Sequence, residues 1–170
     1  MVTNETHKNV STRLKNGVGR SLYMIIKALD VNNRKEALEL VLSVFMQFEA
    51  PDYSNQGIKT FVDFIHNQEE IDKLDFFGAF KDDEIVGVVA TRNNGNHIAL
   101  LFVDGKHHRE GIGRKLFETI SQKSLEGRIT VNSSPYAVEF YKKMGFIPNS
   151  EEQITDGIRY TPMTFVKEKN

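Results

Sequence analysis

Residues 99–114, ALLFVDGKHHREGIGR, contain the pattern that decides the fold. The apolar run Ala99–Val103 has the length and side-chain bulk of a buried strand. A short charged turn follows, and the glycines at 111 and 113 then open an amphipathic helix. This arrangement brings free backbone N–H groups together with the positive end of the helix dipole. It therefore predicts a site for a phosphate or pyrophosphate group. Lys106, Arg109 and Arg114 add positive charge around it.

The glycine spacing excludes two common phosphate-binding loops. A Walker loop requires G-x-x-x-x-G-K-[ST], which the chain lacks. A dinucleotide-binding loop requires G-x-G-x-x-G after the first strand of a βαβ unit, but Gly111 lies two-thirds of the way along the chain. The two glycines are also consistent with close packing or a positive φ alone, so both interpretations stay open at this point.

A second pattern lies in residues 131–146, VNSSPYAVEFYKKMGF. Ser134 is the expected N-cap of a short helix, Pro135 fits the first helical position, and Gly145 fits the position just after the helix end. The aromatic residues of this helix are Tyr136, Phe140 and Tyr141. Rings at helical spacing are usually core residues, which is the alternative to a catalytic role.

Together the two patterns resemble the GCN5-related N-acetyltransferases, the GNAT superfamily. The acyl-CoA motif of that family, [RQ]-x-x-G-x-[GA], corresponds here to residues 108–113, with His108 where Arg or Gln is usual. The family's A-x-x-F-Y-x-x-x-G-F segment matches Ala137–Phe146 at every fixed position. The departure at His108 leaves Arg109 as the expected source of positive charge, and a histidine there could make affinity depend on pH near neutrality.

The resemblance implies a mixed α/β (α+β) fold with a mostly antiparallel central sheet and helices on both faces. It implies transfer of an acetyl group from acetyl-CoA, as cosubstrate, to a primary amine by direct attack in a ternary complex. The alternative is a non-catalytic acyl-CoA-binding sensor or partner-binding module of the same fold. An unrelated α/β nucleotide-binding domain fits less well, because an antiparallel meander precedes the glycine loop.

The resemblance also implies roles for individual residues. Tyr141 is the candidate general acid, since a phenol near the sulfur can donate to the departing thiolate. Glu49 is the candidate general base; Asp52, Tyr53, His97 or a chain of water molecules are the alternatives. The expected acyl-CoA-binding residues are Phe102 and Val103 at the strand edge, His108, Arg109, Glu110, Gly111, Ile112, Gly113 and Arg114 around the pyrophosphate, and Asn132 beside the pantetheine. No metal is expected, because His107 and His108 are adjacent and lack an evident third ligand.

Composition narrows the partners. The 170 residues suit one domain, and 22 basic against 23 acidic residues give no basis for binding nucleic acid. The chain has no cysteine, which fits a cytoplasmic protein, and no apolar run long enough for a membrane span. The expected partner is a small-molecule or peptide amine, with no membrane partner. A homodimer is an open expectation, because dimers are common in the family.

The remaining elements follow from periodicity and turn residues. We expect residues 1–23 to be a disordered leader or extension and residues 24–170 to form the single domain, with a first strand at Met24–Leu29. Asn33 and Glu36 have capping-box spacing for the first helix, and Ser54 is the expected cap of the second. The acidic, aromatic loop Phe48–Ser54 between them would suit a cationic amine.

Overall fold

The computed structural model describes residues 10–15 and 21–169. Its strands are β1 Val10–Lys15, β2 Ser21–Ala28, β3 Asp75–Lys81, β4 Glu84–Arg92, β5 His97–Val103, β6 Arg128–Ser133, β7 Ile147–Pro148, β8 Gln153–Thr155 and β9 Ile158–Val166. Its α-helices are α1 Arg34–Val44, α2 Asn55–His66, α3 Gln68–Asp72, α4 Ile112–Lys123 and α5 Val138–Lys143. Shorter helical segments are the π-helix η1 Phe45–Glu49 and the 3₁₀ turns η2 Ala50–Asp52, η3 Gly105–His107 and η4 Pro135–Ala137.

The sheet is mixed and mostly antiparallel, as the sequence predicts. Its strand order is β1-β2-β3-β4-β5-β6-β9-β7, and β8 pairs with β9 at the side. Strands β1 to β5 form an antiparallel meander, and β5 and β6 make the parallel contact. The hairpin between β3 and β4 turns through Asp82 and Asp83, both at positive φ, as a two-residue hairpin requires.

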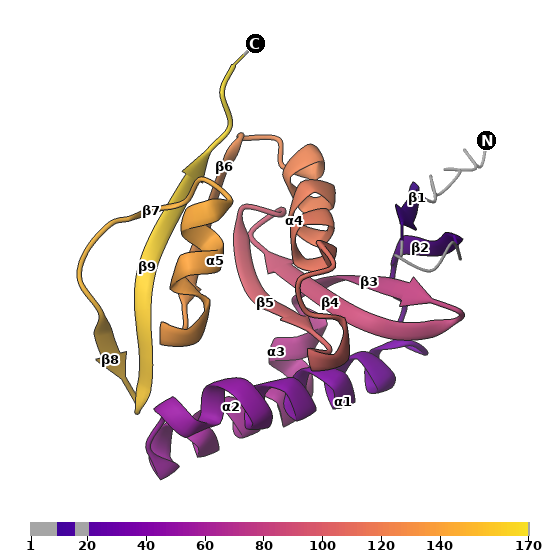
Figure 1. The fold of residues 1–170 in the computed structure, drawn as a ribbon. Coiled ribbons are helices and arrows are strands. Elements are labelled where there is room, and N and C mark those ends of the chain that lie inside the picture. Colours follow the sequence, from indigo (N-terminus) through magenta and orange to yellow (C-terminus); the bar gives the residue numbers. More distant parts are fainter. Residues whose placement is uncertain (1–9, 16–20, 170) are drawn as a thin grey trace, which may run out of the picture.

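The helices cover both faces of the sheet (Figure 1). One buried cluster packs α1, α2 and α3 against β3, β4 and β5, and includes Phe45, Val88 and Leu100. The other packs α4 and α5 against the opposite face, and includes Leu116 and Tyr141. Alternate residues of each central strand face opposite sides, so the two cores share the strands. The fold class expected from sequence is confirmed.

The N-terminal segment differs from the expectation. Strand β2 begins at Ser21 rather than Met24, and Val10–Lys15 forms β1 paired antiparallel with β2. The described parts of residues 1–23 therefore belong to the sheet, while residues 1–9 and 16–20 lie outside the described residues. The segment VSTRLK at residues 10–15 has no apolar run that would predict a strand.

The helix caps were predicted with mixed success. Ser54 accepts a hydrogen bond from the Gly57 N–H at 3.2 Å, which confirms the cap of α2. Asn33 occupies the N-cap position of α1 without a side-chain cap, so the capping box with Glu36 is wrong. The Asp30 carboxylate instead accepts the Asn32 and Asn33 N–H groups at 2.8 and 3.2 Å. At the end of α5, Gly145 has a φ of 99°, and the Phe146 N–H donates to the Tyr141 carbonyl at 3.0 Å, a Schellman motif.

Candidate active site

Strands β5 and β6 separate shortly after they meet. Only His97 pairs with Thr130 and Ile98 with Val131, so β5 from Ala99 to Val103 has a free edge towards β6. The register of β4 and β5 also shifts between Ala90 and Thr91, which leaves Ala99 as an extra residue. A bulge next to a separating strand pair re-aims side chains into the gap. A cavity of about 350 Å³ occupies this region.

The N-terminus of α4 opens beside the same strand. Gly111 is its N-cap, with a φ of 78° in the left-handed region and nothing within 4 Å of where a Cβ would stand. The first bond of the helix runs from the Lys115 N–H to the Gly111 carbonyl, so the N–H groups of Ile112, Gly113 and Arg114 have no acceptor within the helix. Open space, free donors and the helix dipole fit a pyrophosphate group.

Glycine is required at positions 111 and 113 for different structural reasons. Gly111 supplies a positive φ, whereas a Cβ on Gly113 would stand 3.0 Å from the Phe140 ring of α5. Gly113 thus allows close packing of α4 on α5, which is the structural interpretation left open by the sequence. Arg109 also has a positive φ, 64°.

Glu110 turns its side chain into the protein. Its carboxylate accepts hydrogen bonds from Lys81 Nζ and from His107 Nδ1. Lys81 lies on β3 and is only 5% exposed. Burial acts to raise the pKa of Glu110, but the bonds from Lys81 and His107 outweigh it, so the pKa lies below its usual range. Glu110 therefore ties the loop before α4 to Lys81 of β3.

Two other residues expected around acyl-CoA also have buried side chains. Ile112 is 1% exposed in the core under α4, and Phe102 is 7% exposed and packs on Phe61 of α2. Phe102 still lines the cavity, whereas Ile112 does not. Val103 ends β5 at the free edge, and Asn132 of β6 is exposed and lines the cavity.

His108 ties the loop to the π-helix η1. Its Nε2–H donates to the Val103 carbonyl at 2.9 Å, and its ring lies 4.7 Å from that of Phe48. Phe48 in turn lies 5.6 Å from the Tyr136 ring of η4. The histidine that stands where the family motif usually has Arg or Gln is thus fixed to the end of β5.

Glu49 is the last residue of η1 and lines the cavity. A π-helical turn displaces side chains from regular helix positions, and such turns are frequent at functional sites. Its carboxylate accepts one hydrogen bond, from the Ser134 hydroxyl at 2.8 Å. Burial raises its pKa to about 7, against the lowering effect of Ser134 and with a small addition from Asp52.

Tyr141 reaches the cavity from the other face of the sheet. It lies on α5, is 4% exposed, and lines the cavity together with Glu49. Burial, with the nearby Glu49 carboxylate, raises its pKa above the ordinary value. No hydrogen bond of its hydroxyl is found among the described residues, and its ring packs in the core against Phe140 and Phe146. Tyr141 is therefore a core ring that also lines the cavity.

Ser134 occupies the expected N-cap position but does not make the expected capping hydrogen bond. It precedes η4, but its side chain makes no cap; its hydroxyl donates to Glu49 instead. The residues are 85 positions apart in the chain. A local cap pattern and a distant carboxylate compete for the same hydroxyl, and only the folded chain shows which one receives it.

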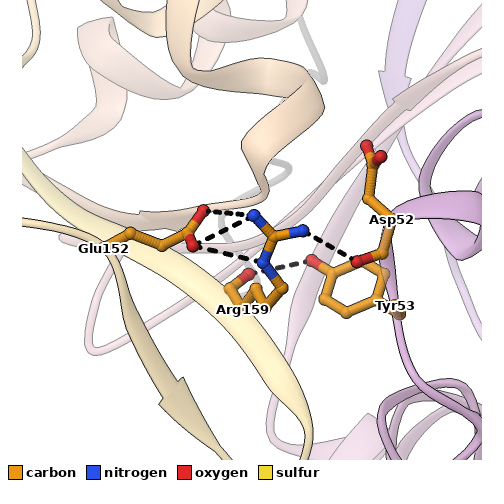
Figure 2. Close-up of polar contacts among 4 residues, drawn as sticks. All are labelled: Asp52, Tyr53, Glu152 and Arg159. Atoms are coloured by element: carbon orange, nitrogen blue, oxygen red, sulfur yellow. Dashed lines mark hydrogen bonds and ion pairs between the residues drawn. The ribbon is translucent and has the colours of Figure 1, made fainter.

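The other candidates for the general base, Asp52, Tyr53 and His97, are less suited to accept a proton. The Tyr53 hydroxyl donates to the Arg159 carbonyl at 3.0 Å, and Arg159 donates to the Asp52 carbonyl and to both oxygens of Glu152 (Figure 2). These contacts join the η2 loop to β9 at the side of the cavity. His97 lines the cavity, but burial, helped by Arg92, lowers its pKa to about 4.

Comparison with known proteins identifies the family. Residues 49–167 match the family described as an acetyltransferase (GNAT) domain. The chain belongs to the GNAT family. As a GNAT protein it is an acyl-CoA-dependent N-acyltransferase, and the resemblance drawn from the two sequence motifs is confirmed.

Solved structures share the fold at low sequence identity. A GCN5-related N-acetyltransferase from Rhodopseudomonas palustris is 16% identical, with a TM-score of 0.71 over 92% of this chain and 98% of that one. The PaiA N-acetyltransferase from Thermoplasma acidophilum, solved in complex with coenzyme A, is 18% identical, with a TM-score of 0.65 over 84% and 98%. Apo YjaB from Escherichia coli is 20% identical, with a TM-score of 0.67 over 85% and 99%. No curated protein matches the sequence.

Two further findings concern the described residues alone. Residues 10–15 and 21–169 include no group of three His, Asp or Glu side chains placed to hold a metal ion. Within the same part of the chain, none of the helices combines the length and apolar character that a membrane crossing requires.

Proposed function

We propose that this GNAT protein transfers an acetyl group from acetyl-CoA to a primary amine of a small molecule or peptide, by direct attack in a ternary complex. The observation that carries the proposal is the meeting of two side chains from opposite faces of the sheet. Glu49 from η1 and Tyr141 from α5 line one cavity where β5 and β6 separate. A base on one side of the gap could take the proton of the attacking amine, and an acid on the other side could give a proton to the departing thiolate. Both steps take place at the same thioester carbon.

The acyl-CoA would lie along the free edge of β5. Backbone groups of Phe102 and Val103 would pair with the amides of the pantetheine arm, as an added strand would. The free N–H groups at the start of α4 would hold the pyrophosphate, with Arg109 and Arg114 adding charge and the Asn132 amide facing the pantetheine. Glu110 and His108 would act by fixing the loop that presents these donors.

Glu49 would serve as general base. The attacking nitrogen must lose a proton, and a base works best when its pKa lies near the working pH, as a value of about 7 does. His97, with its pKa near 4, is a weak base at neutral pH. The Tyr53 hydroxyl is held by Arg159.

Tyr141 would serve as general acid. Its raised pKa keeps the phenol protonated, and its hydroxyl is free to donate. The acyl-CoA supplies the thioester carbon: a C–N bond forms there and the C–S bond breaks. The nitrogen proton passes to Glu49 and the phenol proton to the sulfur, so that an amide and free CoA result once solvent exchanges the two protons. This pairing counts against a purely sensory module.

Titration of the purified protein with acetyl-CoA in a calorimeter tests the binding half. The chain offers a matched pair of variants, Gly111→Asp and Gly95→Asp. Both glycines have a positive φ, 78° and 81°, and both have open space where a Cβ would stand. Backbone strain is therefore equal, but only Gly111→Asp places a negative charge at the α4 N-terminus.

We expect saturable binding to the wild type, unchanged binding to Gly95→Asp and at least tenfold weaker binding to Gly111→Asp. Equal binding by all three would remove the α4 N-terminus from the site. A folded wild type that does not bind millimolar acetyl-CoA would overturn acetyl-CoA as the donor. Amine acetylation by wild type and not by Tyr141→Phe would then test the catalytic half.

A further inference from the structure

The end of the cavity far from α4 contains an arginine without a counter-charge. Arg92 ends β4 and stands opposite His97 of β5 in the sheet register. Both line the cavity. Within the described part of the chain, Arg92 makes no ion pair or side-chain hydrogen bond. An arginine in a partly buried cavity is stabilised by a carboxylate or phosphate, which its planar group can hold through two bonds.

The other ionisable side chains of the cavity do not neutralise Arg92. Arg159 is taken up by Glu152 and the Asp52 carbonyl, so this pair is balanced by itself (Figure 2). Glu49 has a pKa of about 7 and is half protonated at neutral pH. His97 is neutral near pH 7, because burial, helped by Arg92, lowers its pKa to about 4. Its Nδ1 is hydrogen-bonded to the Thr130 hydroxyl at 2.8 Å.

The position of Arg92 separates it from the acyl-CoA. It lies at the amino end of β5, next to His97, whereas the α4 loop follows the carboxyl end at Val103. Six strand residues span about 20 Å. At the His97 end β5 and β6 are still paired, so the separation that would admit the pantetheine begins beyond it. An anion bound by Arg92 would therefore belong to the acceptor and not to the donor.

Aromatic rings line the same cavity as Arg92. Phe61 and Phe64 come from α2, and Tyr160 comes from β9. No second arginine or lysine without a partner lines the cavity within the described residues, which favours a singly charged carboxylate over a phosphate. The cavity lining thus combines the Arg92 cation, the aromatic rings and the candidate base Glu49.

We propose that the acceptor is a small amine that also carries a carboxylate and an apolar body, of the amino-acid class, with the carboxylate bound by Arg92 and the nitrogen directed to Glu49. This inference rests on the proposed function and narrows it. It replaces the cationic amine that the acidic loop at residues 48–54 suggested, because the cavity also contains Arg92, a cation without an ion pair among the described residues.

The test compares apolar amino acids, such as phenylalanine and leucine, with their carboxamides. The readout is the ratio of kcat/KM for acid and amide in the wild type, Arg92→Gln, Arg92→Lys and the exposed control Arg128→Gln. Comparing the same ratio between proteins cancels the intrinsic reactivity of each amine. Succinyl-CoA and acetyl-CoA are compared as donors in parallel.

The wild type should prefer the acids, and Arg92→Gln should reduce the acid-to-amide ratio about tenfold or more, since a charged hydrogen bond is lost. Arg92→Lys should keep part of the preference, and Arg128→Gln all of it. An unchanged ratio in Arg92→Gln, or no acid acetylated although acetyl-CoA binds, would overturn the inference and leave the proposed function in place. A preference for succinyl-CoA that Arg92→Gln abolishes would also overturn it, by assigning Arg92 to the donor. Absence of acetyl-CoA binding would instead be a failure of the proposed function.

Discussion

The pKa values of two glutamates, Glu110 and Glu49, are shifted in opposite directions. Glu110 precedes α4 and receives hydrogen bonds from Lys81 and His107, so its pKa lies below the usual range despite burial. Glu49 ends η1 and receives one bond from the neutral Ser134, so burial raises its pKa to about 7. Both carboxyls lose solvent, and the presence or absence of a cationic partner decides the sign of the shift.

The difference separates a structural carboxylate from a proton-exchanging one. Glu110 stays ionised and fixes the loop that would bind pyrophosphate. Glu49 changes its protonation near neutral pH, which suits a general base. Under the proposed function, the carboxylate beside the acyl-CoA would be structural and the carboxylate beside the acceptor would take part in proton transfer.

The largest effect is expected from replacing the two glutamates in turn. Glu49→Gln should lower kcat/KM about 100-fold or more at pH 8 and leave acetyl-CoA affinity unchanged, because it removes a base that does not contact the cosubstrate. Glu110→Gln should weaken acetyl-CoA binding and leave turnover at saturation nearly unchanged. Steady-state kinetics with calorimetric titration separates the two. Equal losses of turnover in both variants would contradict the division of roles.

Stability should change in opposite directions. The folded-state pKa of Glu49 is above its unfolded value, so the carboxyl costs nothing below about pH 4.5, costs more as the pH rises from about 4.5 to about 7, and has its full cost above about 7. Glu49→Gln should therefore stabilise the protein by about 3 kcal/mol at pH 8 and hardly at all at pH 4, as a shift from 4.5 to about 7 implies. Glu110→Gln should destabilise it at pH 8. Urea denaturation at the two pH values measures both, and a loss of stability in Glu49→Gln at pH 8 contradicts the burial argument.

Without the Lys81 ammonium, the pKa of Glu110 should be raised by burial, as that of Glu49 is. In Lys81→Met the burial of Glu110 remains without its main donor, so the pKa of Glu110 should rise and the protein should lose about 1–3 kcal/mol at pH 8. Denaturation across pH measures this change. Lys73→Met, at an exposed lysine, is the control and should have little effect. A Lys81→Met protein as stable as the control would show that the buried pair does not hold the loop.

The smallest effect is expected from Ser134→Ala. It removes the hydrogen bond that lowers the pKa of Glu49, so that pKa should rise further. Activity at pH 7 should fall several-fold and recover at pH 9, where the carboxyl is ionised again. Ser133→Ala is the neighbouring control, since that hydroxyl donates to the Ser134 carbonyl. A loss of activity that persists at pH 9 would indicate a structural defect instead.

Local sequence patterns predicted many of the strands, turns and helix ends. The apolar run Ala99–Val103 predicted the strand that is observed as β5 at His97–Val103. The glycines near α4, the Pro135 turn and the Gly145 helix end follow from rules that act within a few residues. The contact of Ser134 with Glu49, the pairing of Lys81 with Glu110 and the isolation of Arg92 join distant segments. No local spacing encodes such contacts, so the sequence named Glu49 and Tyr141 only through the family resemblance and missed the rest.

The most direct test of the account is the pH dependence of kcat/KM for the wild type and Glu49→Gln, measured with one amine acceptor at saturating acetyl-CoA. The account predicts that wild-type activity rises with pH through an apparent pKa of about 7. In Glu49→Gln that rise should be absent, leaving only the ionisation of the acceptor amine itself. A rise through the same pKa in Glu49→Gln would contradict the account, because another group would then be the base.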